Sequence, residues 1–242
     1  MKITFKDVSS SDYNLHVKSA GSVMNAEKRV EEGYAIGRDG AYTFEDGYNN
    51  KILSFVLAYK GTGGLTERET ALRMAANWLR GSGKLLIGYK DGIEYEATVI
   101  SEVADQLSAW MNKLSVSFSV KPIAQGNADI VVTDASVVSG DGIDFTCAGL
   151  YESRPVIKLS GTAASVTLTD GTNSFTYTGL SGDVYIDCDN MVVHDGASPK
   201  VNKISGFSGD FPVIENGSNT FAVTGTITNL AVTITYRDKY LA

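Results

Sequence analysis

The chain has 242 residues, 43% of them hydrophobic and 20% charged, which excludes a disordered protein and is enough for one large or two ordinary domains. Its net charge is −7. The whole imbalance lies in the second half, because residues 1–126 hold 15 basic and 15 acidic residues whereas residues 127–242 hold 6 and 13. An acidic surface repels phosphate, so we expect no sequence-independent binding of nucleic acid by the second half.

Neither a membrane span nor a secretory signal is expected. The longest apolar stretch, residues 52–59, is too short to cross a bilayer. Residues 3–6 alternate between apolar and polar, unlike the continuous apolar centre of a signal peptide. We therefore expect a protein that is made in a cytoplasm and has no membrane partner.

The first fifty-nine residues predict short strands and tight turns. Apolar residues recur at every second position in 3–5 and 13–17, with a polar turn at 7–12. The segment 37–40 has glycine at both ends and aspartate between them, which favours a tight turn with positive φ. The nearly continuous apolar run 51–59 is typical of a strand covered on both faces.

One helix is predicted over residues 67–80. Thr66 and Glu69 have the spacing of a capping box, in which each side chain accepts a hydrogen bond from the other residue's backbone N–H. Gly81 provides the C-terminal stop. The apolar face expected at helical spacing consists of Leu72, Ala75, Ala76 and Leu79, broadened by Met74 and Trp78.

After the helix, three further segments complete the first half. Strands are expected at 84–89 and 94–100, joined by an Asp91-Gly92 hairpin turn, and a third at 114–120. The segment 103–112 is open between a short helix, favoured by the spacing of its apolar residues, and a connection.

A domain boundary is predicted just after residue 121. Pro122 is the first proline of the chain, and the charge balance changes sign there. We expect an N-terminal domain at 1–122 and a C-terminal domain at 127–242. The second has closely spaced strand patterns without a helix, which predicts an antiparallel β-sandwich. Its expected hairpin turns are Asp170-Gly171 and Thr228-Asn229, and its expected strands are 130–138, 143–148, 155–160, 164–169, 174–178, 183–188, 191–193, 220–227 and 230–236.

Residues suited to catalysis are few. His16 and His194 are the only histidines, and the pair His194-Asp195 is interpreted as a polar turn that closes a strand, in preference to a general base. No Gly-x-Ser-x-Gly motif occurs. Asp187 and Asp189 share one face of a strand, where they are either surface carboxylates, which we favour, or a site for glycoside hydrolysis or calcium. We predict no enzyme, no cofactor and no metal.

Three other features have two interpretations each. Residues 61–64 precede the helix as a phosphate loop does, but without its lysine, so a flexible loop is favoured. Cys147 and Cys188 are expected to be small buried hydrophobes, with a disulfide or a metal site as alternatives. Four tyrosines form either a sugar-stacking platform or, as we favour, part of a core or interface. They are Tyr177, Tyr185, Tyr236 and Tyr240.

The order of these segments is familiar as a whole. Ile3-Thr4-Phe5 is followed by the 37–40 turn, by a helix ending in Asn77-Trp78-Leu79, and by a strand that stops at Pro122. The second half continues with Gly209-Asp210-Phe211-Pro212 and closes on Tyr236-Arg237. This arrangement resembles the distal tail protein (Dit) family of long-tailed phages over nearly the whole chain. The positions that carry the resemblance are Gly37, Arg38, Asp39, Gly40, Trp78, Leu79, Phe211, Pro212, Tyr236 and Arg237.

The resemblance implies a structural virion protein. Its N-terminal domain would be β-barrel-like with one helix and would form a ring, a hexamer, that joins the tail tube to the tail tip or baseplate around a channel for DNA. Its C-terminal domain would be a galectin-like sandwich that serves as an attachment platform. The implied partners are further copies of the chain and the tail tube, tape-measure, tail-tip and receptor-binding proteins, without sequence-specific nucleic acid.

The implied location is the virion tail, after synthesis in the cytoplasm of the host bacterium. The family has no catalytic residues to carry over. The alternative function is a carbohydrate-binding module or adhesin that acts through the C-terminal sandwich, and weak glycan binding stays open in either case.

Overall fold

The computed structural model describes residues 1–22, 26–34, 36–88, 92–101, 104–108 and 111–241. The chain divides into two compact units, Met1–Gln125 with Leu241, and Gly126–Tyr240. Both are mainly β with antiparallel pairing, as the sequence predicts.

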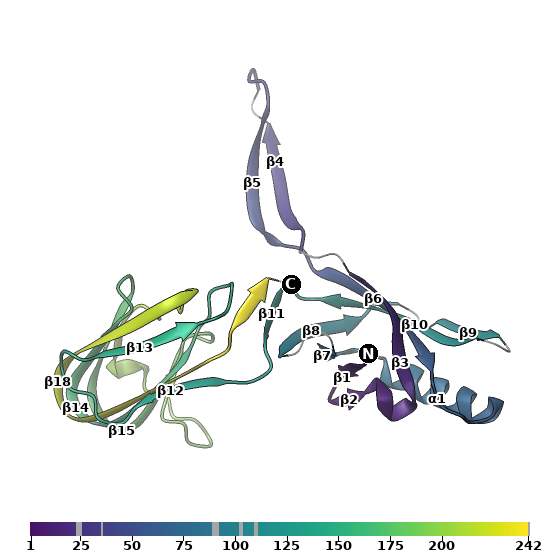
Figure 1. Ribbon diagram of the computed structural model, residues 1–242. Helices are drawn as coiled ribbons and strands as arrows, with labels where there is room; N and C mark the ends of the chain where they lie inside the picture. Colours follow the sequence, from purple (N-terminus) through teal and green to yellow (C-terminus); the bar gives the residue numbers. More distant parts are fainter. Residues whose placement is uncertain (23–25, 35, 89–91, 102–103, 109–110, 242) are drawn as a thin grey trace. The chain divides into compact units, whose positions relative to one another are not determined.

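The N-terminal unit is an antiparallel sheet that carries one α-helix (Figure 1). The sheet runs in the order β2-β1-β7-β8-β10-β6-β3, with β9 paired to β10 and β11 paired to β8. The N–H of Val17 in β3 donates to the carbonyl of Met1, which brings one end of the sheet to the start of the chain. The elements are β1 Ile3–Phe5, β2 Val8–Ser9, the 3-10 turn η1 Ser10–Tyr13, β3 Leu15–Ser22, β4 Lys28–Tyr34, β5 Ala41–Tyr48, β6 Lys51–Tyr59, α1 Leu65–Trp78, β7 Ser82–Ile87, β8 Ile93–Val99, β9 Ala104–Ser108, β10 Met111–Val120 and β11 Ile123–Gly126.

Helix α1 covers the apolar face of this sheet. Leu72, Ala75 and Leu79 are buried, whereas Met74 is 58% exposed and lies off the expected face. The predicted capping box is wrong. The helix begins two residues earlier than expected, with Gly64 as N-cap and without a side-chain cap, so the Thr66 backbone is already helical. Gly81 has the positive φ expected of it, +69°, but the helix ends earlier than predicted, at Trp78 with Leu79 as C-cap.

Two expectations for the N-terminal strands are wrong. β6 is buried on one face only, because Leu53, Phe55 and Leu57 point into the core while Ile52 is 55% exposed. Of the segment 103–112, the described residues 104–108 form neither a helix nor a connection. They form β9, which pairs with the start of β10 from Met111 to Ser115. The backbone N–H and C=O groups of β9 thus find hydrogen-bond partners across this ladder, as they would have done within a helix.

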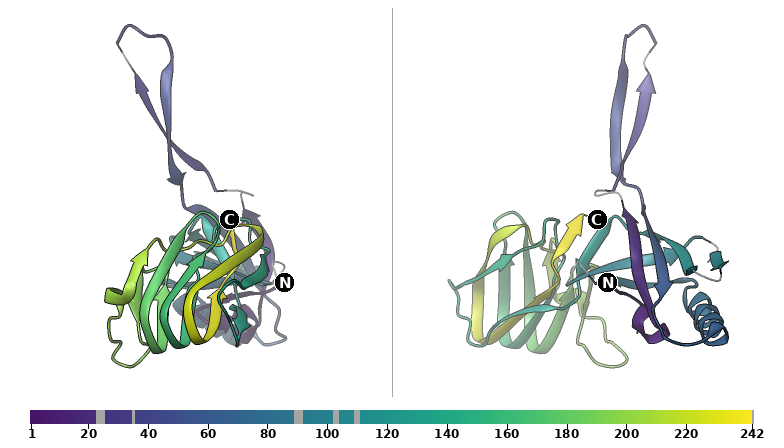
Figure 2. Two further views of the ribbon diagram at one scale, coloured as in Figure 1. Left: turned by 90° about the vertical axis from the view of Figure 1, so that its left-hand side faces the viewer. Right: turned by 45° about the vertical axis from the view of Figure 1, so that its right-hand side comes forward.

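The C-terminal unit is one strongly curved sheet built on three long strands, β14, β15 and β18 (Figure 2). β12 and β13 follow one edge of β18, and β16 and β17 follow the outer edge of β15. The elements are β12 Ile130–Asp134, β13 Gly142–Cys147, β14 Val156–Thr169, β15 Ser174–Asp187, β16 Val192–His194, the 3-10 turn η2 Ile204–Gly206, β17 Phe207–Gly209 and β18 Gly217–Tyr236, followed by β19 Lys239–Leu241, which is not a strand of this sheet.

Each long strand serves both halves of the sandwich. In β14 the buried residues are Ile157 and Leu159 before the bend, but Val166 and Leu168 after it, so the buried positions change from odd to even. The pairing with β18 shifts register between Thr162 and Ser165, and such a bulge moves the following side chains to the other face. Both halves therefore point their apolar residues into one core.

Glycines make the bend of β14 and β18 possible. Gly161 and Gly225 have φ of +132° and +135°, and a Cβ on either would collide with a carbonyl of the neighbouring strand. The expected hairpin turn at Thr228-Asn229 is wrong, because these residues lie inside β18 at the bend. The turn at Asp170-Gly171 is confirmed, since it joins β14 to β15 next to the pair Thr169–Ser174.

Candidate functional site

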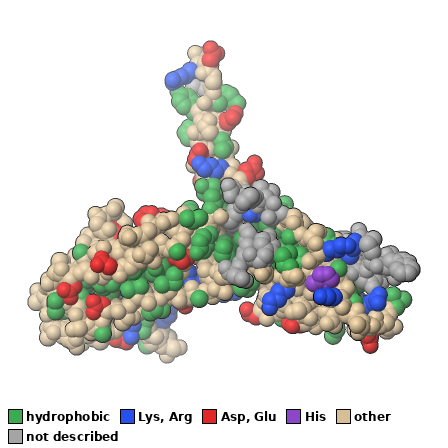
Figure 3. All heavy atoms as spheres, viewed as in Figure 1, with side chains coloured by type: hydrophobic (Ala, Val, Ile, Leu, Met, Phe, Trp, Pro, Cys, Tyr) green, Lys and Arg blue, Asp and Glu red, His purple; other side chains and the backbone are tan. Residues whose placement is uncertain are grey.

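The hairpin β4–β5 is the strongest candidate for a functional surface. Its two strands pair only with each other (Figure 1), and no side chain described in them is buried. Apolar and charged side chains alternate along the hairpin (Figure 3). Ile36 is fully exposed and Tyr34 is 77% exposed. The exposed large apolar residues of this hairpin are Val30, Tyr34, Ile36, Tyr42 and Phe44.

The predicted turn lies at the tip of this hairpin. Gly37 and Gly40 have φ of +81° and +90°, as expected. The Arg38 guanidinium lies 5.2 Å from the centre of the Tyr42 ring and donates to the Tyr42 hydroxyl. Asp39 is exposed. The contacts that hold the described residues of the tip thus come from within the hairpin.

Local pairs along the strands replace a core. Lys28 Nζ lies 2.6 Å from Glu45 Oε2, and the hydrogen bond and charge of Glu45 raise the pKa of Lys28. The Tyr34 hydroxyl donates to Glu32, which raises the pKa of Tyr34. Such exposed pairs contribute little stability. The hairpin therefore shows apolar side chains to solvent without the packing that would normally hold them.

The remaining positions of the resemblance are structural. Leu79 is buried, and Trp78 Nε1 donates to the carbonyl of Phe5 at 2.8 Å in the N-terminal core. Pro212 is buried, and the Phe211 ring stacks on Phe207 with centroids 4.6 Å apart. With the hairpin tip, these positions belong to separate parts of the fold and form no single site.

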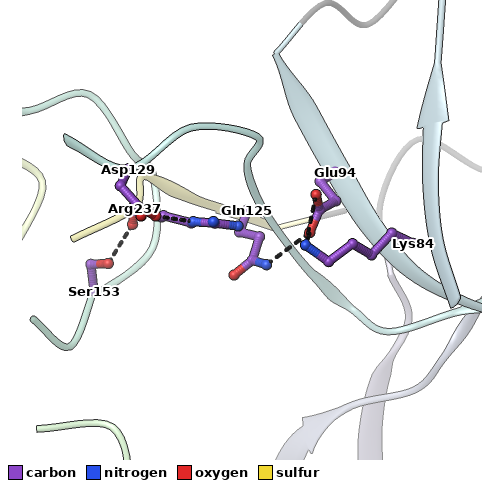
Figure 4. Close-up of polar contacts among 6 residues, drawn as sticks. All are labelled: Lys84, Glu94, Gln125, Asp129, Ser153 and Arg237. Carbon is purple, nitrogen blue, oxygen red and sulfur yellow. Dashed lines mark hydrogen bonds and ion pairs between the residues drawn. The ribbon is translucent and has the colours of Figure 1, made fainter. Parts of the chain in front are cut away.

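The last two of these positions stabilise the end of the chain. The buried Tyr236 donates its hydroxyl hydrogen to the carbonyl of Thr146 at 3.0 Å. Arg237 Nε bonds Asp129, and the carbonyl of Arg237 accepts from Ser153 Oγ (Figure 4). Both residues are therefore engaged in contacts within the C-terminal unit.

A buried carboxylate in the N-terminal unit was not predicted. Glu94 is 5% exposed and lies 3.1 Å from Lys84 Nζ, and it accepts from Gln125 Nε2 at 3.1 Å (Figure 4). The three residues lie on β7, β8 and β11. A Glu-Tyr-Glu alternation gives no signal of which glutamate is buried, so the sequence could not have shown this contact.

His194 and Asp195 form a structural turn, as interpreted from the sequence. The buried His194 ring stacks on Tyr185 with centroids 5.5 Å apart, and its Nδ1 accepts from Gly196 N–H. Asp195 Oδ1 accepts from Ala197 and Val201 N–H, and these bonds lower the pKa of Asp195. Neither side chain is free to act as a base.

The two aspartates expected on one strand face are also engaged separately, because Asp187 ends β15 whereas Asp189 lies in the turn after it. Asp187 accepts from the backbone and the side chain of Asn190. Asp189 lies 3.6 Å from Lys239 Nζ. Among the residues that the structure describes, no three His, Cys, Asp or Glu side chains gather as metal ligands would.

The tyrosines and cysteines of the C-terminal unit lie mainly in its core. Tyr177 and Tyr236 are buried, which agrees with the favoured interpretation and leaves no four-tyrosine platform. Cys147 and Cys188 are free and buried. Burial raises the pKa of Cys188 to about 12, so this thiol stays protonated and unreactive at neutral pH.

The glycine-rich segment before α1 holds the helix start. Arg68 Nε donates to the carbonyl of Gly63 at 2.9 Å, and the Glu67 side chain fills the space that a Cβ on Gly63 would need. A carboxylate at this place disfavours phosphate. Over the described part of the chain, the helix α1 lacks the length and apolarity that crossing a bilayer requires.

Comparisons with known proteins place the fold. No protein-family model matches the sequence, and no curated protein does. The structure is similar to the Dit protein of phage SPP1, described as a paradigm of the hub adsorption apparatus in phages that infect Gram-positive bacteria, with a TM-score of 0.76, 13% identity and 99% of both chains covered. A chain of the phage P2 baseplate, in its activated conformation with calcium, matches with a TM-score of 0.50, 8% identity and 100% of this chain and 98% of that one covered. The chain therefore has the fold of the SPP1 Dit protein over essentially its whole length.

Proposed function

We propose that this protein is a structural component of a phage tail, a hub of the Dit type. The observation that carries the proposal is the fold shared with SPP1 Dit across 99% of both chains. A match that includes both units is more informative than a match to one sandwich, because sandwich domains alone serve many functions. The role is non-enzymatic, in keeping with the engaged histidine and aspartates described above.

The hub would form a closed homo-oligomeric ring, a hexamer. Exposed apolar residues on the hairpin β4–β5 support this part, because a neighbouring copy would cover them. A hairpin that contacts a different surface on the next copy makes a heterologous interface, and such an interface closes into a ring under cyclic symmetry. Residues 1–126 carry no net charge, which suits a ring whose central channel DNA passes through.

The ring would connect the tail tube to the tail tip or baseplate in the virion tail. Its expected partners are the tail tube, tape-measure and tail-tip proteins at the ring faces. The C-terminal sandwich would serve as the platform for receptor-binding proteins. The alternative of a carbohydrate-binding module has weaker support, because two of the four candidate tyrosines are buried.

The test is the mass of the purified chain over a range of concentrations, measured by light scattering and by electron microscopy, alone and with a tail partner. We expect six copies in a ring. The informative variant replaces residues 30–45 with a short turn, and we expect it to fold and to stay monomeric. A wild-type chain that remains monomeric with every tail partner contradicts the proposal.

A glycan array separates the alternative function. Reproducible binding that is lost in Tyr185→Ala, which removes one of the two candidate tyrosines that are only half-buried, would favour a carbohydrate-binding module. Its absence, together with a ring, would favour the hub.

A further inference from the structure

A hollow of about 290 Å³ lies beside β16 in the C-terminal unit. Its walls come from β16 and from the segment that follows it, up to η2. The residues that matter most are Met191, Val192, His194, Lys200 and Ile204. The proposed ring rests on the hairpin β4–β5 and does not use this hollow.

Apolar side chains gather around the hollow. Met191, Val192 and Ile204 line it and are 57%, 45% and 42% exposed, and the neighbouring Val201 is also exposed. These four lie within fourteen residues of sequence, whereas the described remainder of the C-terminal unit has only three exposed large apolar residues. Single exposed apolar residues are common on proteins, but a group of them around a concave surface marks an interaction site.

The walls of the hollow are fixed by hydrogen bonds. Asp195 Oδ1 accepts from Ala197 and Val201 N–H at 3.0 Å each, which clamps the loop after β16. Lys203 N–H donates to the carbonyl of Val193 at 2.8 Å, which holds the far end of this loop against β16. His194 stacks on Tyr185 underneath. The hollow is therefore formed before any partner arrives, which lowers the entropic cost of binding.

The rim of the hollow carries a positive charge, whereas residues 127–242 as a whole have a negative net charge. Lys200 is exposed on the hollow and has no ion-pair partner among the residues described. The nearby carboxylates are engaged elsewhere, since Asp189 lies 3.6 Å from Lys239 and Asp195 accepts two backbone N–H groups. The charge of Lys203 also helps to lower the pKa of Asp195. An unpaired lysine beside apolar side chains complements a carboxylate next to an apolar group.

We propose that this hollow docks a partner protein through a segment that presents a large apolar side chain next to a carboxylate. The apolar side chain would fill the space between Met191 and Ile204, and the carboxylate would meet Lys200. The inference rests on the proposed function in one respect, since a tail hub needs docking surfaces for other proteins. A sugar fits this surface less well, because its hydroxyls would find mostly aliphatic side chains.

Selection from a display library of short random peptides on the full-length protein tests the proposal. We expect the enriched peptides to pair an acidic residue with a large apolar one. In fluorescence-anisotropy titrations of a synthetic copy of one such peptide, Lys200→Glu and Ile204→Ser are each expected to weaken binding about tenfold or more. Lys60→Glu, an exposed lysine of the N-terminal unit, and Val138→Ser, an exposed apolar residue outside the hollow, are the matched controls and should leave binding unchanged.

Each outcome decides the matter. Peptides without an acidic residue, or binding that Lys200→Glu leaves intact, overturn the proposal, as does a glycan that competes at the hollow. The oligomeric state of the same preparations keeps this test separate from the proposed function. A chain that forms no ring but selects acidic–apolar peptides contradicts the ring and supports the docking hollow, and a ring without such peptides does the reverse.

Discussion

Two hairpins of this protein have the same topology and opposite surroundings. β14 and β15 pair with each other, and β18 and β16 flank them, so that their alternate residues fill a core. β4 and β5 also pair with each other, but no other described strand flanks them and no described side chain in them is buried. Both carry large apolar residues. They differ in whether this chain alone covers those residues.

The difference separates residues that specify the fold from residues available for assembly. A two-stranded ribbon is marginally stable in water without further packing. β4–β5 keeps an apolar surface that the rest of the described chain does not cover, and a surface of this kind is typical of an interaction site. The comparison predicts that equal substitutions have unequal consequences in the two hairpins.

The largest expected effect comes from removing one phenylalanine ring from each. Phe175 of β15 is 1% exposed and stacks on Phe207 at 5.4 Å, so we expect Phe175→Ala to lower the free energy of unfolding by about 3–5 kcal/mol. Phe44→Ala on β5 should change it by less than about 0.5 kcal/mol, while weakening ring formation. Urea denaturation of dilute monomer measures the first quantity and light scattering the second. Similar losses of stability for both would contradict the comparison.

The next effect concerns glycines with positive φ. A Cβ on Gly225 would meet the carbonyl oxygen of Ser165 in the adjacent strand, so Gly225→Ala should cost about 2–3 kcal/mol through strain at the bend. Gly37 also has positive φ, but a Cβ there meets nothing within 4 Å, so Gly37→Ala should cost about 1 kcal/mol at most. Thermal unfolding compares the two. A loss of stability in Gly225→Ala that is no larger than the loss in Gly37→Ala would show that the sandwich does not depend on this bend.

The bend also explains which strands the sequence could predict. The alternation of buried residues in β14 is correct on each side of residue 162, so the two expected strands 155–160 and 164–169 were nearly right. The shift in phase between them looks like a turn, because a sequence does not show that the ladder continues through a bulge. Thr228-Asn229 in β18 was misread as a turn for the same reason.

The candidate surface was only partly predictable. Residues 37–40 predicted the turn correctly, since the need for positive φ is local. The flanking strands 28–34 and 41–48 carry charged and apolar residues on both faces, so neither face is the uniformly apolar one that burial imposes. Nor could the sequence show that Gly64 begins the helix in place of the better cap Thr66, because the folded loop decided between them.

A smaller effect concerns how stability depends on pH, which should differ between the turn that joins β14 to β15 and the tip of β4–β5. Burial works to raise the pKa of Asp170, but N–H donors from Asn173, Thr172 and Val213 outweigh it and hold that pKa below the ordinary value. A depressed pKa contributes stability that is complete above the unfolded value of about 3.9 and is lost as pH falls through the lower folded pKa. Asp170→Asn should therefore cost on the order of 1–2 kcal/mol at pH 7 and flatten the stability profile at acid pH. Asp39→Asn at the exposed tip of β4–β5 is the control, and an equal acid dependence in both variants would contradict this assignment.

The smallest expected effect distinguishes two cross-strand ion pairs, one from each hairpin. Lys158 lies 2.8 Å from Asp183 and also over the ring of Tyr185, so Lys158→Ala should cost up to about 1 kcal/mol. Lys28 pairs with Glu45 on the solvated hairpin, and Lys28→Ala should leave the unfolding midpoint where it is, because the hairpin is not part of either core. Glu45 raises the pKa of Lys28. The pair's contribution to stability is therefore fully present below the unfolded pKa of about 10.4, and it is lost as pH rises through the folded pKa. Amide hydrogen exchange in β4 and β5 should therefore speed up in the monomer of Lys28→Ala while the exchange of β14 and β15 stays unchanged. If the ring covers the hairpin, the same variant should show no faster exchange once assembled, which ties this exposed ion pair to the surface that assembly would bury.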